Sequence, residues 1–350
     1  MKRTASIAFK FVGVIVVIAT LAAGYLAWAW NRPLNPGSEI YLVKPGTGLR
    51  ALANEFSRRR VIPESVSFVM LGYIVVPKRD FKAGEYQFRD GMSARAILTQ
   101  VAAGHVVEYP VRLLEGWTFQ QVREELESAP RLAQTLAGLS KAEIMQRMGA
   151  PGVHPEGRFF PDTYFYTAGS NDLSILQRAY AKMQARLRQE WESRDTNVPF
   201  ATADEALILA SIVEKETGRS EERGLVAGVF INRLNKRIRL QTDPTVVYGL
   251  GEKYDGRIHK RDLLTDTPYN TYTRYGLPPT PIAMPGVASL HATLHPEQTN
   301  ALYFVARGDG SHEFSDTLTK HNQAVSKYQL GGKPFPATPL PPTKPAGKSR

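Results

Sequence analysis

A helix that is apolar on nearly every face constrains the fold of this chain more than any other feature. It is the segment LILASIVEKETG, residues 207–218, in which Ser211, Glu214 and Lys215 share one narrow polar stripe at the helical period of about 3.6 residues. Leucine, isoleucine, valine and alanine cover most of the remaining surface. Such a helix packs inside a core, where a glutamate is rare unless it is paired or functional. Glu214 is therefore the first candidate for chemistry.

Glu214 lies near the C-terminal end of that helix. The negative end of the helix dipole and partial desolvation both favour a protonated carboxyl group there, and those conditions suit a general acid. The alternative is a structural ion pair with Lys215, Arg219 or Arg223, which follow closely in the chain. Glu216 falls on another face, and we expect it to be solvated or ion-paired.

Residues 11–30 form a second apolar segment, and it contains no charged residue. Its length matches the roughly 20 residues that a helix needs to span a bilayer. Basic residues precede it, so the positive-inside rule predicts a cytoplasmic N-terminus over residues 1–10, a single transmembrane helix and the rest of the chain beyond the inner (plasma) membrane. A cleaved signal peptide is the alternative, because residues 27–29 resemble a cleavage site. The apolar run exceeds the usual h-region of roughly 7 to 15 residues, which favours an uncleaved anchor.

Cysteine content and net charge narrow the possible functions. The chain contains no cysteine, which excludes disulfides, thiolate nucleophiles and cysteine-ligated metals. Its formal net charge of +11 suits an anionic polymer or a membrane surface. No nucleic-acid partner is expected, because most of the chain is predicted to lie outside the cytoplasm and no nucleic-acid-binding motif is visible. An anionic cell-wall glycan or an acidic lipid surface fits the charge better.

Residues 39–130 contain a weak internal repeat. Its three copies begin at Tyr41, Tyr86 and Tyr109, and each has the pattern of a strand, a glycine turn and a helix. We therefore expect small βα units in this region and not a long solenoid. The first copy resembles a LysM-like module, a βααβ fold that binds N-acetylglucosamine polymers. The alternative is a spacer that holds the catalytic part away from the membrane.

The following region, residues 131–330, is predicted to be a catalytic domain of mixed α/β structure, which makes the fold class of the whole chain α+β. Residues 333–350 are rich in proline and lysine, and we expect this tail to be disordered. Sequence patterns within the catalytic region predict helices over 172–191 and 221–236, a strand over 237–241, a helix start at 242–244 and a hairpin over 302–314.

Four segments of the C-terminal half are too unusual to be ordinary connections. They are EGRFFPDTYFY, INRLNKRIRLQTDPTVVYGLG, TPYNTYTRYGLPPTPIAMPG and HEFSDTLTKHN, which begin at residues 156, 231, 267 and 312. Together with SIVEKET they resemble the YceG-like endolytic murein transglycosylases, and the resemblance extends from the N-terminal anchor to about Tyr328. It implies that Glu214 is the single essential acid/base. It also implies peptidoglycan glycan strands as substrate and a periplasmic active domain tethered to the inner membrane.

The chemistry of that family agrees with a single glutamate. Hydrolysis of a glycoside normally needs two carboxylates, and the sequence offers one convincing candidate. A lytic transglycosylase can operate with one, because the C6 hydroxyl of N-acetylmuramic acid attacks within the substrate and closes a 1,6-anhydro ring. Intramolecular attack has a high effective molarity, so water is not needed as a reactant.

We expect polar and aromatic side chains of the same segments to hold the sugars by stacking and hydrogen bonding. The candidates are Asp162, Tyr164, Gln241, Asp243, Tyr248, Asn270 and Tyr272. Structural roles compete with this interpretation, because Asp243 can cap a helix, Tyr248 can be a core residue and Asn270 can close a turn. Asp243 and Asn270 are the preferred candidates.

No metal and no cofactor are expected. His291 and His295 are spaced as i and i+4 but lack the adjacent glutamate of a zinc-protease helix, and neither a phosphate-binding glycine loop nor a serine nucleophile elbow is visible. The sequence thus favours an anchored lytic transglycosylase that cuts within nascent glycan strands. The alternative is a non-catalytic glycan-binding scaffold that recruits peptidoglycan synthases.

Overall fold

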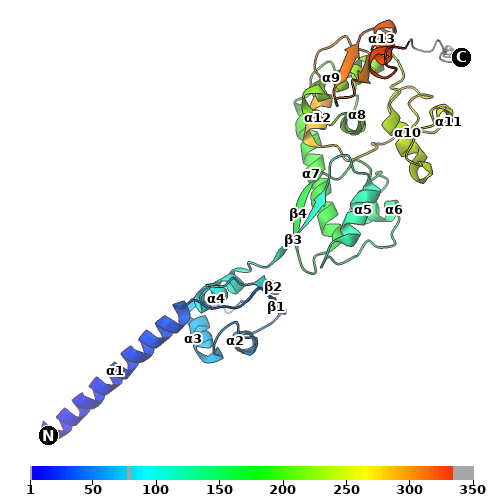
Figure 1. The fold of residues 1–350 in the computed structure, drawn as a ribbon. Coiled ribbons are helices and arrows are strands. Elements are labelled where there is room, and N and C mark those ends of the chain that lie inside the picture. The colour runs from blue at the N-terminus through cyan, green and yellow to red at the C-terminus, as the bar shows by residue number, and fades with distance from the viewer. Residues whose placement is uncertain (1, 77–79, 334–350) are drawn as a thin grey trace. The chain divides into compact units, whose positions relative to one another are not determined.

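The computed structural model describes residues 2–76 and 80–333, with side chains from residue 9 onward, and most of the expected C-terminal tail lies outside these residues. The chain divides into two compact units (Figure 1). The first comprises Met1–Pro110, Pro130–Ala133 and Phe165–Ser170, and the second comprises Val111–Ala129, Gln134–Tyr164 and Asn171–Arg350. The main division thus falls after Pro110, whereas the sequence-based division was placed at residue 130.

Helix α1 (Lys2–Asn31) contains the long apolar segment. Within it, Phe9–Asn31 is long and apolar enough to cross a membrane, with a mean hydropathy of 2.2. Length and composition are consistent with the expected single-pass anchor. The direction in which it would cross stays a prediction.

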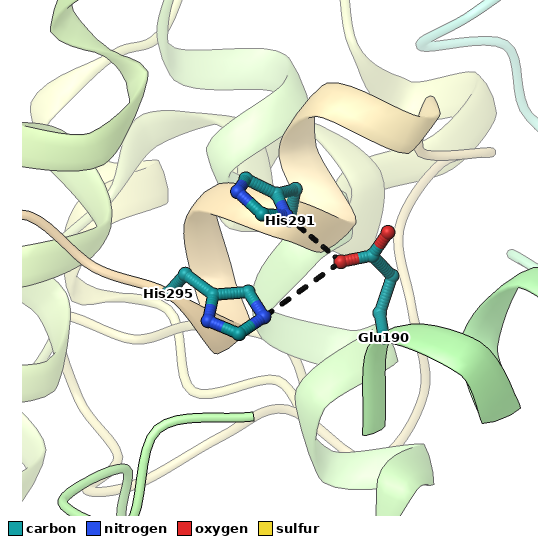
Figure 2. Close-up of side chains that lie close together, drawn as sticks. All are labelled: Glu190, His291 and His295. Carbon is teal, nitrogen blue, oxygen red and sulfur yellow. Dashed lines mark hydrogen bonds and ion pairs between the residues drawn. The ribbon is translucent and has the colours of Figure 1, made fainter. Parts of the chain in front are cut away.

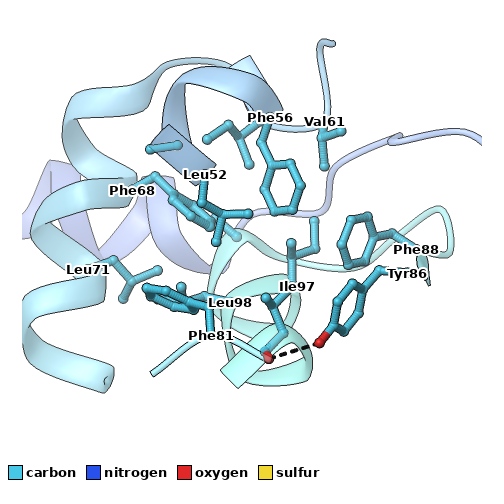
Figure 3. Close-up of a cluster of buried hydrophobic side chains, with 14 of the residues drawn as sticks. Leu52, Phe56, Val61, Phe68, Leu71, Phe81, Tyr86, Phe88, Ile97 and Leu98 are labelled. Atoms are coloured by element: carbon cyan, nitrogen blue, oxygen red, sulfur yellow. Dashed lines mark hydrogen bonds between the residues drawn. The ribbon is translucent and has the colours of Figure 1, made fainter. Parts of the chain in front are cut away.

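After α1, the described residues of the first unit up to residue 103 form an alternating set of strands and helices. They are β1 (Ile40–Val43), α2 (Leu49–Arg58), α3 (Ser65–Val75), β2 (Gly84–Gln87) and α4 (Ala94–Ala103). Strands β1 and β2 are antiparallel, with Tyr41 opposite Tyr86. Phe56, Phe68 and Phe88 pack edge to face in the core between the helices (Figure 3). The order β1–α2–α3–β2 is the βααβ order that the LysM resemblance implied, and the LysM identity itself stays a prediction.

The strand–turn–helix pattern of the three repeat copies is confirmed. The third copy consists of β3 (Glu108–Leu113) and α5 (Phe119–Ser128). In each copy a glycine joins strand to helix with a positive φ, 76° at Gly46, 87° at Gly91 and 74° at Gly116. This left-handed conformation is open to glycine without steric cost, which is why the glycine recurs at the same place.

The second unit is mainly helical. Strand β4 (Asp162–Thr167) forms a two-stranded sheet with β3, and the division between the units falls within both strands. Strands β5 (Tyr303–Ala306) and β6 (His312–Ser315) form the expected antiparallel hairpin. The helices are α6 (Lys141–Arg147), α7 (Asp172–Glu192), α8 (Ala203–Glu216), α9 (Arg223–Asn235), α10 (Asp243–Leu250), α11 (Lys260–Leu264), α12 (Val287–Leu294) and α13 (Leu318–Tyr328), with 3-10 turns η1 (Ser220–Glu222) and η2 (Gly251–Lys253).

Helix α8 is the core helix that its sequence predicted. Helices α7, α9, α10 and α12 all pack against it. Leu207 and Ala210 lie in a cluster with Met183 of α7 and Leu290 of α12. Leu209 lies in a second cluster, which also contains residues of α9. The helix is therefore surrounded on most sides, and its more exposed residues lie mainly in its first turn and in its last turn, which carries Glu214.

The strand expected over residues 237–241 is wrong. Arg237 and Gln241 have φ values of 53° and 51°, which no strand residue can adopt. The segment is instead held by the buried guanidinium of Arg233, which donates hydrogen bonds to the carbonyl oxygens of Arg239 and Leu240 over 3.0 Å. Basic and apolar residues alternate here in an irregular loop around Arg233 and not in a strand.

Candidate active site

The carboxylate of Glu214 lies in the last turn of α8 and is held on one side. Its Oε2 accepts hydrogen bonds from the backbone N–H of Gly286 at 2.9 Å and from the hydroxyl of Ser289 at 2.7 Å. Gly286 is the N-cap residue of α12, so the first turn of α12 supplies both donors. Within the described residues, Oε1 accepts no hydrogen bond. One oxygen is thereby fixed, and the other is left for a ligand.

The ion-pair alternative for Glu214 is not what the structure shows. Among residues 2–76 and 80–333, no ion pair to Glu214 is formed. Lys215 donates to the carbonyl oxygen of Gly116 at 3.3 Å, and Arg219 donates to the carbonyl oxygen of Asp309 at 2.8 Å. Lys215 and Arg219 therefore bind backbone oxygens, whereas the Nε atom of Arg223 is buried without a hydrogen-bond partner among the described residues.

Ser211, one turn before Glu214, fixes the segment that leads to Gly286. Its hydroxyl is buried and accepts a hydrogen bond from the N–H of Ile282 at 3.0 Å. The predicted polar stripe therefore binds two successive parts of the chain. Ser211 binds the segment before α12, and Glu214 binds the first turn of α12.

A second carboxylate, Glu115, lies beside this arrangement and was not found from the sequence. A Cβ atom on Gly286 would lie 1.8 Å from Oε1 of Glu115, so the carboxylate rests directly against that glycine. Burial raises the pKa of Glu115, the negative charge of Glu214 raises it further, and Arg223 opposes the shift. The sequence feature that could have pointed to Glu115 is its place directly before the turn glycine of the third repeat copy. The first copy has a proline at that place.

The loop that carries Glu115 is joined to the segment before Gly286. The N–H of Gly116 donates to the carbonyl oxygen of Met284 at 2.9 Å, and the N–H of Met284 donates to the carbonyl oxygen of Trp117 at 2.7 Å. Gly116 also lies against the side chains of Lys215 and Glu214. These bonds place two segments that are distant in the sequence around the end of α8.

Glu156 is a further acid that sequence reasoning left aside. It is 1% exposed, and its oxygens accept hydrogen bonds from the N–H of Phe119 at 2.8 Å and the hydroxyl of Tyr248 at 2.9 Å. Burial raises the pKa of Glu156 to about 7, although these hydrogen bonds oppose the shift. Tyr248 is therefore committed to a buried carboxyl group, and its ring contacts Tyr269 edge to face.

The expectation that Glu216 is solvated or ion-paired was wrong. Its carboxylate accepts a hydrogen bond from the hydroxyl of Thr242. The residue as a whole is partly exposed, yet burial of the carboxyl group raises the pKa of Glu216. The helical wheel placed Glu216 on another face correctly but could not show that the segment before α10 covers that face.

Three of the predicted sugar-binding residues lie together around Glu216. The hydroxyl of Tyr272 donates to Oδ1 of Asp243 at 2.6 Å, and Oε1 of Gln241 accepts from Arg233 at 3.2 Å. Asp243 is exposed at the first position of α10, and α10 receives no side-chain cap, so the capping alternative for Asp243 is not realised. Burial raises the pKa of Tyr272, and its bond to Asp243 adds to the shift.

Asn270, Tyr164 and Asp162 have structural partners. Asn270 is 1% exposed, and its amide donates to three backbone carbonyl oxygens while its Oδ1 accepts from the N–H of Tyr272 at 2.8 Å. The turn-closing alternative for Asn270 is thus the one observed. Tyr164 is buried and donates to the carbonyl oxygen of Phe160 at 2.7 Å, and Asp162 forms an ion pair with Lys182. No described hydrogen bond joins these three residues to Glu214.

A pocket of about 440 Å³ lies at the opposite end of α8 from Glu214. Glu205 and Ile208 of α8 line it together with Phe200, Leu234 and Leu277. It contains none of the residues predicted to bind sugars. We assign it no part in the site.

Comparison with known proteins shows which family the chain belongs to. The family model described as the YceG-like family matches residues 41–327 of the chain. This chain belongs to the YceG-like family. All four C-terminal motifs and the segment around Glu214 lie within the matched range.

Two relatives and one solved structure extend the YceG-like match. The chain is 31% identical to an endolytic murein transglycosylase of Bacillus subtilis, over 82% of this chain and 83% of the relative. It is 25% identical to an endolytic murein transglycosylase of Streptococcus pneumoniae, over 90% of this chain and 64% of that protein's length. A crystal structure of a YceG-like protein from Listeria monocytogenes is 28% identical, with a TM-score of 0.53, and covers 82% of this chain and 98% of its own.

Proposed function

We propose that this YceG-like chain is a membrane-anchored endolytic lytic transglycosylase. It cleaves the bond between N-acetylmuramic acid and N-acetylglucosamine within peptidoglycan strands and leaves 1,6-anhydro ends. Two relatives named endolytic murein transglycosylase support the reaction class. The observation that carries the proposal is the Glu214 carboxylate, fixed through Oε2 by Gly286 and Ser289 and open at Oε1.

Glu214 acts first as acid and then as base. In its protonated form it donates its proton to the glycosidic oxygen, the bond from that oxygen to C1 of N-acetylmuramic acid breaks, and N-acetylglucosamine leaves with a free hydroxyl. The carboxylate then removes the proton from the C6 hydroxyl of the same N-acetylmuramic acid, whose oxygen bonds to C1. Glu214 ends the cycle protonated, so no water is consumed and no second carboxylate is required.

Glu115 adds a negative charge beside the proton donor. A like charge at close range disfavours ionisation of its neighbour, so the pair Glu115 and Glu214 retains a proton more readily than either group alone. In this proposal Glu115 is a positioning and electrostatic residue, and the bond-making steps belong to Glu214.

Sugar contacts come from the group of polar residues around Glu216. Gln241, Asp243 and Tyr272 lie there, and Asp243 is exposed. A carboxylate oriented by a tyrosine hydroxyl is suited to accept hydrogen bonds from sugar hydroxyl groups. Asp162, Tyr164, Tyr248 and Asn270 contribute through the packing of the domain, because each already has an internal partner.

The location follows from α1. An uncleaved helix would tether the enzyme to the inner membrane with its N-terminus in the cytoplasm and its catalytic part in the periplasm. That placement favours nascent strands as substrate, because they are made at the membrane surface. Peptidoglycan synthases are the partners that this location suggests.

The direct test is product analysis. Uncrosslinked glycan strands are digested with the whole chain purified in detergent, and the new ends are identified by mass spectrometry. We expect internal cleavage and 1,6-anhydro-N-acetylmuramic acid ends. Reducing ends that incorporate oxygen from labelled water would instead show hydrolysis, and the absence of new ends with folded wild-type protein would contradict an enzymatic role.

Hydrolysis is the second candidate function, and Glu115 is the observation that favours it. A pair of carboxylates beside one bond is the arrangement that glycoside hydrolases use. Hydrolysis and transglycosylation differ by one water molecule in the product, so the same mass spectrum separates them. The non-catalytic scaffold alternative predicts neither product.

A further inference from the structure

The first turn of α12 binds Glu214, and a second set of polar side chains lies farther along the same helix. His291 and the C-cap residue His295 lie one turn apart, with ring centroids separated by 4.5 Å. Glu190, near the end of α7, reaches both of them (Figure 2). These three residues play no part in the proposed cleavage reaction.

The three side chains converge on a small volume. Oε2 of Glu190 lies 2.9 Å from Nδ1 of His291 and 3.9 Å from Nε2 of His295. One ligand atom from each residue can be chosen so that all three lie within 4.8 Å of one another. Ligand atoms about 2.0–2.2 Å from a common tetrahedral zinc ion lie about 3.4 Å apart, so the three side chains must move somewhat closer together to bind one.

A fourth residue orients one of the histidines. Nδ1 of His295 is hydrogen-bonded to Oδ1 of Asp195 at 3.0 Å, which leaves Nε2 facing Glu190. A histidine that binds a metal usually donates its other ring N–H to a carboxylate, which fixes both tautomer and ring orientation. The hydroxyl of Ser193 also lies 3.3 Å from Nε2 and would give up that contact.

The burial of the charged Glu190 side chain also favours a bound cation. Its side chain is 10% exposed, and its ion-pair partners in the described chain are these two histidines. Among the described residues, neither a lysine nor an arginine forms an ion pair with this carboxylate, which therefore lacks a permanent counter-ion. A bound cation would supply one.

We propose that Glu190, His291 and His295 bind one divalent transition-metal ion, for which zinc is the best match. Two imidazole nitrogens and one carboxylate oxygen are ligands that zinc accepts in tetrahedral geometry, with water at the fourth position. The ion joins α12 to α7 and thereby steadies the helix whose first turn holds Glu214. The carboxylate ligand comes from α7, a distant part of the sequence, and its role differs from that of the glutamate in a zinc-protease helix, which is a general base.

The test measures metal binding and not cleavage, so its outcome is independent of the proposed function. The whole chain is purified in detergent without a polyhistidine tag, stripped with a chelator and titrated with zinc against a chromophoric competitor. We expect one tightly bound zinc ion per chain and a rise in Tm on binding, because a ligand of the folded state stabilises it. Cobalt substituted for zinc should give the visible absorption of a tetrahedral site.

His291→Ala is the decisive variant, because the His291 side chain is 62% exposed and its loss should not prevent folding. It should remove tight zinc binding and the rise in Tm. His259→Ala is the matched control. Like His291, His259 contacts a carboxylate, that of Asp255, but among the described residues no second histidine contacts the same carboxylate. Asp195→Asn should weaken binding about 10- to 100-fold without abolishing it.

Two results would overturn the proposal. The first is a wild-type chain that binds no stoichiometric zinc in this titration. The second is a folded His291→Ala/His295→Ala double variant that binds zinc as tightly as the wild type, which would place the ion elsewhere.

Discussion

The backbone N–H of Gly286 donates a hydrogen bond to Oε2 of Glu214 over 2.9 Å, while the α-carbon of the same glycine rests against the carboxylate of Glu115. One residue without a side chain thus separates the two acids. The missing side chain allows the close approach of Glu115, and the backbone N–H of the same residue binds Glu214.

Gly286→Ala should therefore abolish most activity. The new methyl group would lie 1.8 Å from Oε1 of Glu115, so either the acid or the start of α12 must move. A displacement near 1 Å at a reacting group can cost on the order of 100-fold in rate. Initial rates of strand cleavage measure the effect, with Gly218→Ala as control because its Cβ would meet open space. Equal rates for Gly286→Ala and wild type would contradict the arrangement.

Glu214→Gln should lose cleavage but keep glycan binding. A proton-transfer group contributes roughly 100- to 10,000-fold to rate, and glutamine can accept the bonds from Gly286 and Ser289 without supplying a proton. Cleavage rate and co-sedimentation with purified sacculi are measured on the same samples. A variant that cleaves normally would remove Glu214 from the mechanism. Full cellular function without cleavage would favour the scaffold alternative.

Glu115→Gln should change the pH dependence of cleavage. Burial and the negative charge of Glu214 raise the pKa of Glu115, so wild-type cleavage should fall as pH rises and this pair of acids loses its shared proton. Glu115→Gln removes that titrating group, so the fall in cleavage with pH should differ from that of the wild type. Rates are measured from pH 4 to 9 at about constant ionic strength, with the exposed Glu252→Gln as control. An unshifted alkaline limb would exclude this electrostatic role.

Glu156→Gln should flatten the pH dependence of stability. The folded-state pKa of Glu156 is about 7, against an ordinary value of 4.5, so the folded state binds more protons between these values. Stability is therefore highest below pH 4.5 for this group and falls as pH rises to about 7. The wild type should lose about 3 kcal/mol over that window that the glutamine variant keeps.

Urea midpoints followed by tryptophan fluorescence measure this difference across the same pH range. Tyr248→Phe serves as a companion variant, because it removes the hydroxyl that binds Glu156 and keeps the ring. Identical pH profiles for wild type and Glu156→Gln would show that Glu156 titrates in its ordinary range.

Local periodicity was enough to predict α8, the hairpin of β5 and β6, and the glycine turns of the repeat, because each depends on residues close in sequence. The position of Glu214 at the end of a buried helix followed from the same pattern. The partners of Glu214 did not, since Gly286 and Ser289 reach it through tertiary packing.

The errors have a common physical origin. The helical wheel assigned Glu216 to a separate face but could not show what covers that face, and alternation over 237–241 did not reveal the buried Arg233 that organises the loop. Asn270 stays a prediction as a sugar ligand, and its amide already donates to three backbone carbonyl oxygens. Such internal bonds are not visible without the three-dimensional structure.

The two hydrogen bonds between Met284 and the loop of Gly116 and Trp117 set the order in which the site can assemble. In the proposed orientation, Glu115 and Glu214 can be brought together only after the segment that carries Met284, Gly286 and Ser289 has followed residues 114–117 across the membrane. Contacts between distant segments are slow to form, because the long intervening loop must first be closed. In that orientation, a chain that is still being translocated should already carry a folded first unit while it is inactive, and cleavage should begin only after Ser289 has emerged.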